Sequence, residues 1–408
     1  MMTVAEPAIA SPRRAFPGVR WAIAGPALAL LLASTFCYLH FYDQQHTLIH
    51  NDLIGRQFAT RAALHGVSPY SRPMTQQIQA VAGHDPGQGF DYPILLAVLL
   101  APVAAVPWET LRLGFLLIMI PALFASFLAC LRLVHVRLAP SQAIALALLC
   151  LLSWPVVFGL RMQQPTLLAA VLILSACYLL SRNYRLSAGV LLALSTFKPQ
   201  LVLPLVLWLL LWSASRRRWT FPLAFAVTET LLLVSGERLV PGWLPQWLAT
   251  LPHYRSLGNI PPLELYAGHW VGACLTAALL LGSLWQLWQL RRCTPESRDF
   301  GYAIALALAT SLCLTPVIWG MIYNQVLLIP AALLLLRAVP PPHGRITALV
   351  WRLTQALLAW TFVSVPLAAL GEALVPSGLF LSLPFLGHLL APLLTLTLLT
   401  ASVPAQPA

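Results

Sequence analysis

Long apolar runs separated by short polar turns occupy most of this chain of 408 residues. A helix that spans a membrane needs about 20 predominantly apolar residues, so the runs predict membrane-spanning helices. We expect them near residues 21–41, 92–106, 112–131, 141–159, 165–181, 186–197, 200–213, 219–235, 268–290, 300–315, 321–337, 347–370 and 378–400. Many prolines interrupt the runs, which is typical of broken or kinked helices around a cavity.

The pattern predicts an all-α polytopic membrane protein with about 11–13 transmembrane helices. The expected domain organisation is a cytoplasmic tail (1–20), a single transmembrane domain (21–400) and a C-terminal tail (401–408). Composition agrees, because 59% of the residues are hydrophobic and only 9% are charged, whereas soluble domains carry roughly 25% charged residues. No small-residue cleavage pattern precedes Asp43, so we expect the first helix to be retained.

The basic residues give an orientation. Sixteen of the 24 lie in the N-terminal tail and in 132–140, 182–185, 214–218, 291–299 and 337–352, which the positive-inside rule assigns to the cytoplasm. They recur between apolar runs rather than on one face, so the net charge of +12 does not indicate a nucleic-acid partner. One conflict remains: two runs lie between Asp91 and Arg132, where this orientation needs an odd number of crossings. Either 92–106 dips without crossing, or Arg132 and Arg137 are external.

Polar residues gather on the opposite, extracytoplasmic side. A first outer loop (43–91) holds four of the five aspartates and four of the ten histidines, and a second outer loop covers 240–268. This segregation predicts a site on the outer face. The seven cysteines lie in or beside apolar runs, which argues against a disulfide framework or a metal cage. We expect no cofactor, and the sequence leaves dependence on a divalent metal open.

Asp52 follows the first apolar run in "HNDLIGRQFATRAALHGVSPY" (50–70). The pattern predicts a helix from Asp52 to about Gly66, with Ser-Pro-Tyr as its stop. Asn51 or Asp52 suits the N-cap, which contributes about 1 kcal/mol. The alternative is that Asp52 is a general base at the membrane surface, and the residues alone do not decide between these roles. Arg56, four positions later, can pair with Asp52 on one helical face.

Lys198 is the only lysine of the chain and lies in "LSTFKPQLVLPL" (194–205). The apolar runs on its two sides are short, which predicts a helical hairpin with its tip below the outer membrane surface. An ammonium group there is costly without a partner, so a functional role is the default hypothesis. A lipid phosphate is its natural partner. The alternative is a side chain that extends to the interface.

Other polar residues of the outer turns are candidates for binding. Arg161, with Gln163 and Gln164, can bind phosphate or sugar hydroxyls, although a single arginine at a turn also serves as an interfacial anchor. Tyr323 and Asn324 can stack on and hydrogen-bond a sugar, or belong to an aromatic belt. The remaining candidates for substrate binding are Tyr70, Gln200, Arg255, Asn259 and Trp319.

Several stretches together carry a family resemblance. They are "ND" (51–52) followed by "HGVSPY" (65–70), "DYPILLAVLLAPVAAVP" (91–107), "GLRMQQPTLLAAVLILSACYLLSRNYRLSAGVLLALSTFKPQ" (159–200), "SLGN" (256–259) and "LTPVIWGMIYNQVLLIP" (314–330). In order and spacing the chain resembles glycosyltransferase family 87, which has the GT-C membrane fold. Its members are similar to mycobacterial polyprenol-phosphate-mannose-dependent α-mannosyltransferases. The likeness spans most of residues 20–337.

The resemblance implies roles for two residues. The family's catalytic aspartate, just after the first helix, matches Asp52, and its Lys-Pro pair matches Lys198-Pro199. Implied with them are a polyprenyl-phosphate monosaccharide donor, a lipid or glycan acceptor, surrounding membrane lipids, and a multi-pass location in the plasma (inner) membrane with an extracytoplasmic site. The implied sugar is mannose or a related hexose or pentose.

The chain also departs from the family pattern. The usual Gly-Gln pair reads Gln163-Gln164 within "RMQQPT", so either glutamine has to stand in for it. The usual Asn-Gln-Ser begins at Asn259 but continues as Ile-Pro, and a histidine common near the Pro-x-x-Trp motif is absent. These departures leave the sugar and the acceptor open.

A different functional class stays in view, a transporter or flippase for a lipid-linked or anionic solute. Transporters also place broken helices and ionisable residues near the middle of the membrane. Against this, the sequence has no visible internal repeat, and its longest polar loop directly follows the first helix. An oligosaccharide ligase of related architecture is a third interpretation.

Overall fold

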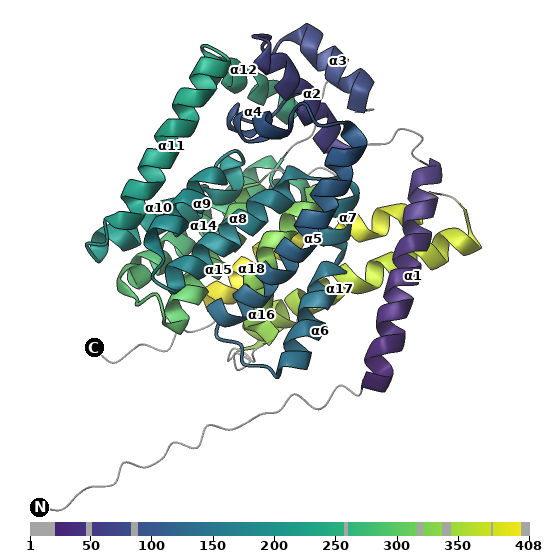
Figure 1. The fold of residues 1–408 in the computed structure, drawn as a ribbon. Helices are drawn as coiled ribbons and strands as arrows, with labels where there is room; N and C mark the ends of the chain where they lie inside the picture. The colour runs from purple at the N-terminus through teal and green to yellow at the C-terminus, as the bar shows by residue number, and fades with distance from the viewer. Residues whose placement is uncertain are drawn as a thin grey trace, which may run out of the picture.

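The computed structural model describes residues 21–45, 51–82, 89–256, 260–315, 321–336, 344–376 and 378–400. The elements in these ranges are helices (Figure 1), so the prediction of an all-α polytopic membrane protein is confirmed. Their bounds are α1 (Trp21–Gln45), α2 (Asp52–Leu64), α3 (Arg72–Ala82), α4 (Leu95–Leu100), η1 (Ala101–Val103), α5 (Trp108–Leu133), α6 (Pro140–Leu151), α7 (Trp154–Arg161), α8 (Pro165–Ser181), α9 (Arg185–Leu194), α10 (Pro199–Ser215), α11 (Thr220–Leu239), α12 (Trp243–Ser256), α13 (Pro262–Ala267), α14 (His269–Gln289), η2 (Leu290–Arg292), α15 (Arg298–Leu314), η3 (Met321–Leu328), α16 (Ile329–Leu336), α17 (Arg345–Leu374), η4 (Phe380–Leu389) and α18 (Leu390–Thr400).

Helices of spanning length are fewer than the apolar runs. In the described ranges, four are long and apolar enough to cross a membrane: Trp108–Leu133, His269–Arg292, Arg345–Leu374 and Phe380–Thr400. A fifth span results if α6 and α7, which meet at 55°, are counted together. Other apolar helices have only 10–17 residues, among them α8, α9 and α10. The expected 11–13 crossings therefore stay a prediction.

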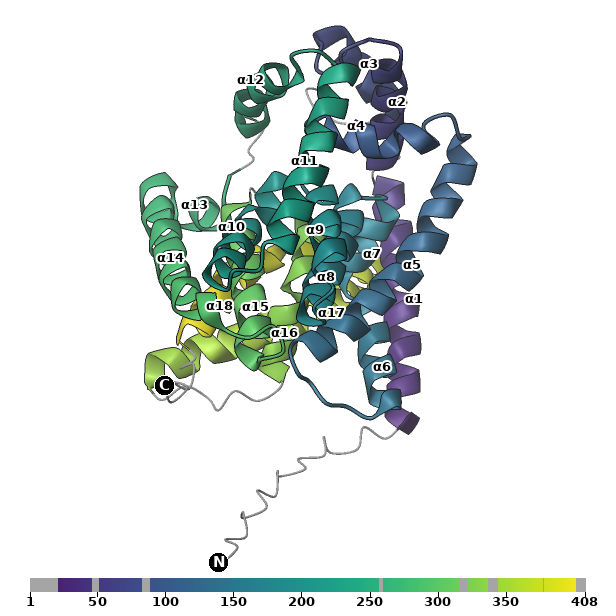
Figure 2. The same ribbon diagram turned by 60° about the vertical axis from the view of Figure 1, so that its left-hand side comes forward.

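The structure bears on the conflict around residues 92–106. This run forms the six-residue α4 and the three-residue η1, which are too short to span, and a single long helix, α5, follows. Figures 1 and 2 place α4 beside α2 and α3, with α5 running from there to the opposite end of the molecule. The helices formed by residues 92–106 are thus too short to span by themselves, which favours the alternative in which this run does not cross.

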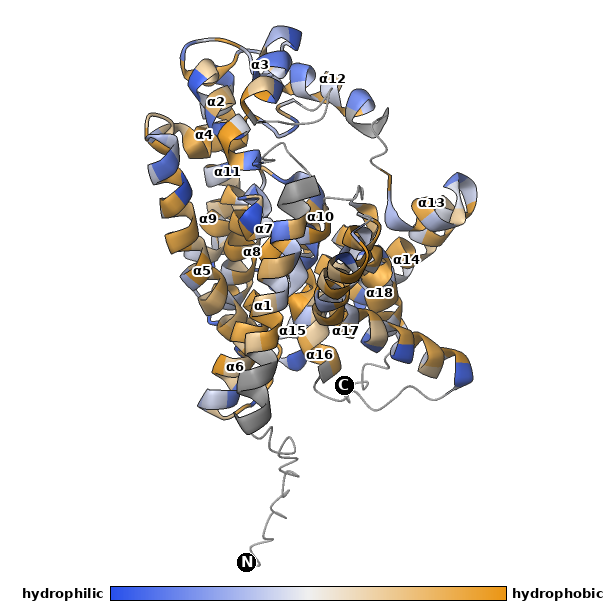
Figure 3. Cartoon of the chain, turned by 90° about the vertical axis from the view of Figure 1, so that its right-hand side faces the viewer, coloured by the Kyte–Doolittle hydropathy of each residue, from blue (hydrophilic) through white to orange (hydrophobic). Residues whose placement is uncertain are grey.

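Short helices form a layer at one end of the bundle, which we call the end layer (α2, α3, α4, η1 and α12). All three ribbon views show it at the same end. In Figure 3, α2, α3 and α12 carry more hydrophilic colours than α5 and α8. The described residues 51–82 of the predicted first outer loop thus form helices at this end of the bundle, and polar residues from several turns meet beneath them.

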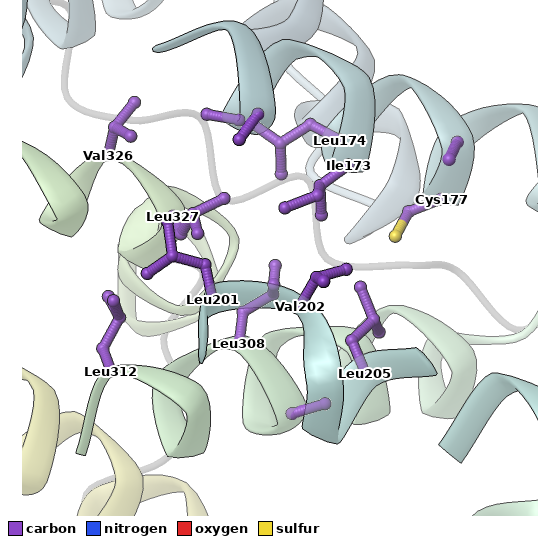
Figure 4. Close-up of a cluster of buried hydrophobic side chains, with 14 of the residues drawn as sticks. Ile173, Leu174, Cys177, Leu201, Val202, Leu205, Leu308, Leu312, Val326 and Leu327 are labelled. Atoms are coloured by element: carbon purple, nitrogen blue, oxygen red, sulfur yellow. The ribbon is translucent and has the colours of Figure 1, made fainter. Parts of the chain in front are cut away.

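A continuous apolar core supports this end of the bundle. Its buried side chains come from α8, α10, α15 and η3, as Figure 4 shows for Ile173, Leu174, Cys177, Leu201, Val202, Leu205, Leu308, Leu312, Val326 and Leu327. Leu201 and Val202 lie within one turn of Lys198, at the start of α10. The floor below the predicted site is therefore apolar and closely packed.

Candidate active site

Asp52 lies at the first position of α2, and the capping role belongs to its neighbour. The side chain of Asn51 accepts hydrogen bonds from the backbone N–H groups of Leu53 (3.0 Å) and Ile54 (3.4 Å). The backbone N–H of Asp52 donates to Met162 O at 3.1 Å. Because Asn51 caps the helix, the Asp52 carboxylate is not needed for capping, and it is buried with 8% exposure. This arrangement favours the chemical role of Asp52.

The turn between α7 and α8 holds the start of α2. Gln163 has a φ of 50°, a left-handed conformation that glycine adopts most readily, and the Asn51 amide donates to its Oε1. This conformation and this hydrogen bond fix the turn that precedes α8. Gln164 is also buried, with its Oε1 at 3.5 Å from the Tyr92 hydroxyl.

Lys198 lies in the turn between α9 and α10, at the N-cap of α10, but α9 packs against α8 and α11 and α10 packs against α15, so these two helices do not form the predicted hairpin. Pro199 excludes Lys198 from helical geometry and starts α10, because proline restricts the residue before it and suits a first helical position. Lys198 is 4% exposed, and its ammonium group donates to the Thr166 hydroxyl. That hydroxyl in turn donates to Asn324 Oδ1 at 3.1 Å. The lysine is thus held inside the protein, which disfavours the interfacial alternative.

An aromatic wall faces the two cations of the site. Lys198 Nζ lies 5.1 Å from the Tyr92 ring centre and 5.2 Å from that of Tyr323, while the Arg56 guanidinium lies 5.0 Å from the Tyr92 ring. Cations are stabilised over the faces of such rings. Tyr70 supports this wall, because its hydroxyl donates to Tyr92 O at 2.9 Å.

Arg56 lies on the same face of α2 as Asp52 and donates to Gly89 O at 2.8 Å. Burial alone would lower the pKa of Arg56, but the charges of Asp52, Tyr92 and Asp91 more than offset it, so the pKa is raised. Asp52 and Arg56 are also the charged groups that act on Lys198, the first attracting and the second repelling it. Asp52 and two buried cations, Arg56 and Lys198, therefore share one electrostatic environment, and the cations suit an anionic ligand.

Asp91 is a second carboxyl group near this centre, and the sequence did not single it out as a site residue. It is half-buried at the end of the first outer loop. Burial raises its pKa to about 6; Arg56 and His253 oppose the rise, and Asp52 adds to it. Such a pKa is suited to a group that takes up a proton near neutral pH.

Replacing Asp91 by asparagine should stabilise the protein at neutral pH. The folded pKa lies above the ordinary value of 3.8, so the folded protein binds this proton more tightly than the unfolded chain does. Stability from this group is full below about pH 4 and falls as the pH rises through about 6. We expect Asp91→Asn to raise the melting temperature of the purified protein by roughly 2–4 °C at pH 7.5, with a smaller difference at pH 4.5. A lower melting temperature at pH 7.5 would mean that the attraction between ionised Asp91 and Arg56 stabilises the protein by more than the burial of Asp91 destabilises it.

The remaining predicted residues lie in different surroundings. Arg161 is half-buried at the end of α7, two positions before Gln163, and Gln200 is exposed on the first turn of α10. The side chain of Arg255, and Asn259 and Trp319 as a whole, fall outside the described residues. Within the described residues, no three His, Cys, Asp or Glu side chains lie close enough together to hold a metal ion.

Sequence reasoning missed Tyr92 and Thr166 as members of the site. Arg56 and Lys198 both lie over the ring of Tyr92, and Thr166 is hydrogen-bonded to both Lys198 and Asn324. Both residues lie in quoted stretches, but each begins an apolar run, where tyrosine and threonine are common interfacial residues. Only their contacts with segments distant in sequence distinguish Tyr92 and Thr166 from ordinary interfacial residues.

The fold and the site together define a polytopic membrane protein with a buried, cation-rich centre at one end. The model of glycosyltransferase family 87 matches residues 90–262, so the family resemblance is confirmed over this segment. The segment contains Asp91, Tyr92, Gln164, Thr166 and Lys198. No curated protein and no solved structure matches the chain. The family match and the helical membrane architecture support a membrane glycosyltransferase.

Proposed function

We propose that the protein transfers a monosaccharide, mannose or a related hexose or pentose, from a polyprenyl-phosphate donor to a glycolipid or glycan acceptor. The reaction takes place on the extracytoplasmic face of the plasma membrane, which the end layer covers. The observation that carries the proposal is the burial of Asp52 with Lys198 and Arg56 around Tyr92. A carboxylate for the acceptor and cations for the phosphate are the two requirements of such a transfer.

The proposed reaction is a single displacement at the anomeric carbon. Asp52 takes the proton of the acceptor hydroxyl while the acceptor oxygen bonds to that carbon. The bond from the carbon to the phosphate oxygen breaks, and polyprenyl phosphate leaves with the electron pair. Lys198, helped by Arg161, stabilises the charge that develops on the phosphate. One displacement with one carboxylate base inverts the anomeric centre.

The other candidates bind substrate around these two groups. Arg56, Gln164 and Asn324 have polar side chains next to the buried centre, while Tyr323 offers a ring for the sugar. Gln163 and Tyr70 mainly position their neighbours. The further substrate contacts proposed from sequence are Gln200, Arg255, Asn259 and Trp319. The cations can neutralise the phosphate, so the proposed step uses no cofactor.

The test is transfer from synthetic polyprenyl-phosphate mannose to membrane glycolipids by the purified protein in lipid nanodiscs. We expect a product with an inverted anomeric centre. Parallel reactions with other prenyl-phosphate sugars identify the donor, and reactions with a chelator or with added Mg²⁺ or Mn²⁺ measure metal dependence. If wild type transfers sugar from none of these donors, the proposal is wrong, and movement of prenyl-phosphate sugars across vesicles then tests the transporter alternative.

A further inference from the structure

Arginines gather at the ends of α8, α10 and α14, away from the candidate active site. The segments 182–185, 216–218 and 291–299 together hold eight arginines and two carboxylates, Glu296 and Asp299. Helices α8 and α10 start at the candidate active site, and each runs for 17 residues before the first two of these segments. That length is about 25 Å at 1.5 Å per residue. The arginines are therefore separate from the site described above.

Asn183 draws two guanidinium groups to one oxygen atom. Arg218 donates to Asn183 Oδ1 at 3.0 Å, and Arg185 donates to the same atom at 3.4 Å. The Asn183 amide in turn donates to Glu296 Oε1 at 2.7 Å. Asn183 has a φ of 64°, a left-handed conformation that asparagine accepts more readily than most residues. The turn between α8 and α9 thus holds Arg185 and Arg218 side by side.

Arg216 joins the segment after α14 to these two residues. Its guanidinium donates to the backbone oxygens of Arg292 (2.6 Å) and Cys293 (3.3 Å). Burial lowers the pKa of Arg218, and the charges of Arg185 and Arg216 lower it further. The three guanidinium groups of Arg185, Arg216 and Arg218, which we call the arginine patch, therefore repel one another.

The arginine patch has more hydrogen-bond donors than the protein has acceptors for them. Each guanidinium has five N–H donors, whereas the bonds of the patch within the described residues use one side-chain oxygen and two backbone oxygens. The Nε atoms of Arg185 and Arg216 are buried and have no hydrogen-bond partner there. Glu296 opposes the repulsion, but it already accepts from the Asn183 amide. The patch therefore suits a further anion, and phosphate matches the geometry of guanidinium groups.

Exposed aromatic side chains flank the patch. Tyr184 and Trp219 are exposed, and each is next to a patch arginine in the sequence. Trp288 is also exposed and lies 4.1 Å below the Arg291 guanidinium, where the apolar helix His269–Arg292 ends. Tyrosine and tryptophan gather at the level of the lipid head groups, and basic pockets between transmembrane helices bind anionic head groups. These neighbours favour a lipid as the source of the phosphate.

Helix α11 offers an apolar surface that starts beside the patch. It begins at Thr220, two residues after Arg218. Leu223, Val227 and Leu231 are exposed and lie four positions apart, so they share one face of the helix. A lipid whose phosphate lies at the patch can therefore place an acyl chain along α11, whereas a free phosphate ion gains nothing from this surface.

We propose that Arg185, Arg216 and Arg218 bind the headgroup phosphate of an anionic phospholipid from the surrounding membrane. The bound phosphate offsets the repulsion among the three guanidinium groups. It also joins the α8–α9 turn, the α10–α11 turn and the segment after α14. The inference does not depend on the proposed transfer reaction, because the arginine patch and the candidate active site are at different ends of α8 and α10.

The test is native mass spectrometry of the full-length protein in detergent, titrated with dioleoyl-phosphatidylglycerol, dioleoyl-phosphatidylcholine or glycerol phosphate. We expect wild type to bind phosphatidylglycerol most tightly. Arg185→Gln and Arg218→Gln should each weaken this binding about fivefold, the effect of one basic residue near an anionic surface, and leave binding of phosphatidylcholine unchanged. If wild type binds glycerol phosphate as tightly as phosphatidylglycerol, the patch is a site for a soluble phosphate and the inference is wrong.

Glu296→Gln tests the patch in the opposite direction. It removes the carboxylate that opposes the arginines, while the new amide can still accept from Asn183. Binding of phosphatidylglycerol should become about fivefold tighter, a gain that misfolding does not produce. The matched control is Arg137→Gln, which removes an exposed arginine between α5 and α6, outside the patch, and should leave the affinity unchanged. If this control weakens binding as much as Arg185→Gln does, or if Glu296→Gln has no effect, diffuse surface charge accounts for the binding and the inference is wrong.

Discussion

Asp52→Asn is expected to lower the turnover number for sugar transfer about 10²- to 10⁴-fold, the contribution typical of a general base. The substitution keeps the shape of the side chain. Asn51, not Asp52, caps α2, and the hydrogen bond to Met162 O comes from the backbone of residue 52. The variant should therefore fold, bind the donor and fail to deprotonate the acceptor. Turnover in nanodiscs, together with donor binding, separates these effects.

A matched control for this prediction is Asp299→Asn, which removes a carboxylate from the first turn of α15 in a segment predicted to be cytoplasmic. It should transfer sugar at the wild-type rate. Full activity of Asp52→Asn would show that Asp52 is not the base. If Asp91→Asn were inactive instead, Asp91, whose pKa is raised to about 6, would be the general base.

Lys198→Met should lower kcat/KM about 10²- to 10³-fold, because it removes a preorganised charge that stabilises the departing phosphate. Methionine is apolar and similar in length, so a buried position accepts it without a desolvation penalty. We expect the melting temperature to stay near that of wild type while binding of polyprenyl phosphate weakens. Steady-state kinetics with varied donor and a binding assay with the sugar-free lipid measure both effects.

Lys198→Arg keeps the charge and serves as the comparison for that variant. The guanidinium is larger and planar, and the pocket bounded by Thr166, Tyr92 and Tyr323 is shaped around a compact ammonium group. Activity should therefore fall between those of wild type and Lys198→Met. If Lys198→Met retained wild-type kcat/KM, the lysine would have only a structural role.

The sequence singled out Asp52 and Lys198 because each breaks a local pattern, and the structure buries both side chains. Lys198 is a single charge between two short apolar runs, and Pro199 marks the turn. Asp52 follows the first run, where Asn51 can take the cap. Each of these signals depends only on residues that are close together in the sequence, so it can be recognised without knowledge of the fold. The all-helical class follows from apolar composition in the same way.

Other features depend on packing between distant segments and leave no local signal. The run 92–106 is as apolar as a transmembrane helix, but α2 and α11 bury it within the protein. Composition does not distinguish burial against helices from burial in lipid. The left-handed backbone of Gln163 and the partnership of Thr166 with Lys198 arise in the same way, from contacts made only after the bundle has formed.

The bond between Asn51 and Gln163 joins residues 112 positions apart, and this separation has a consequence for biosynthesis. Chains are made from the N-terminus, and contacts form only after both partners have emerged. Helix α2 is therefore made long before the turn that positions it, and Lys198 and Asn324 follow later still. A nascent chain that ends before residue 324 carries Asp52 but lacks part of the buried centre around Lys198. The buried centre is thus completed late in the synthesis of the chain.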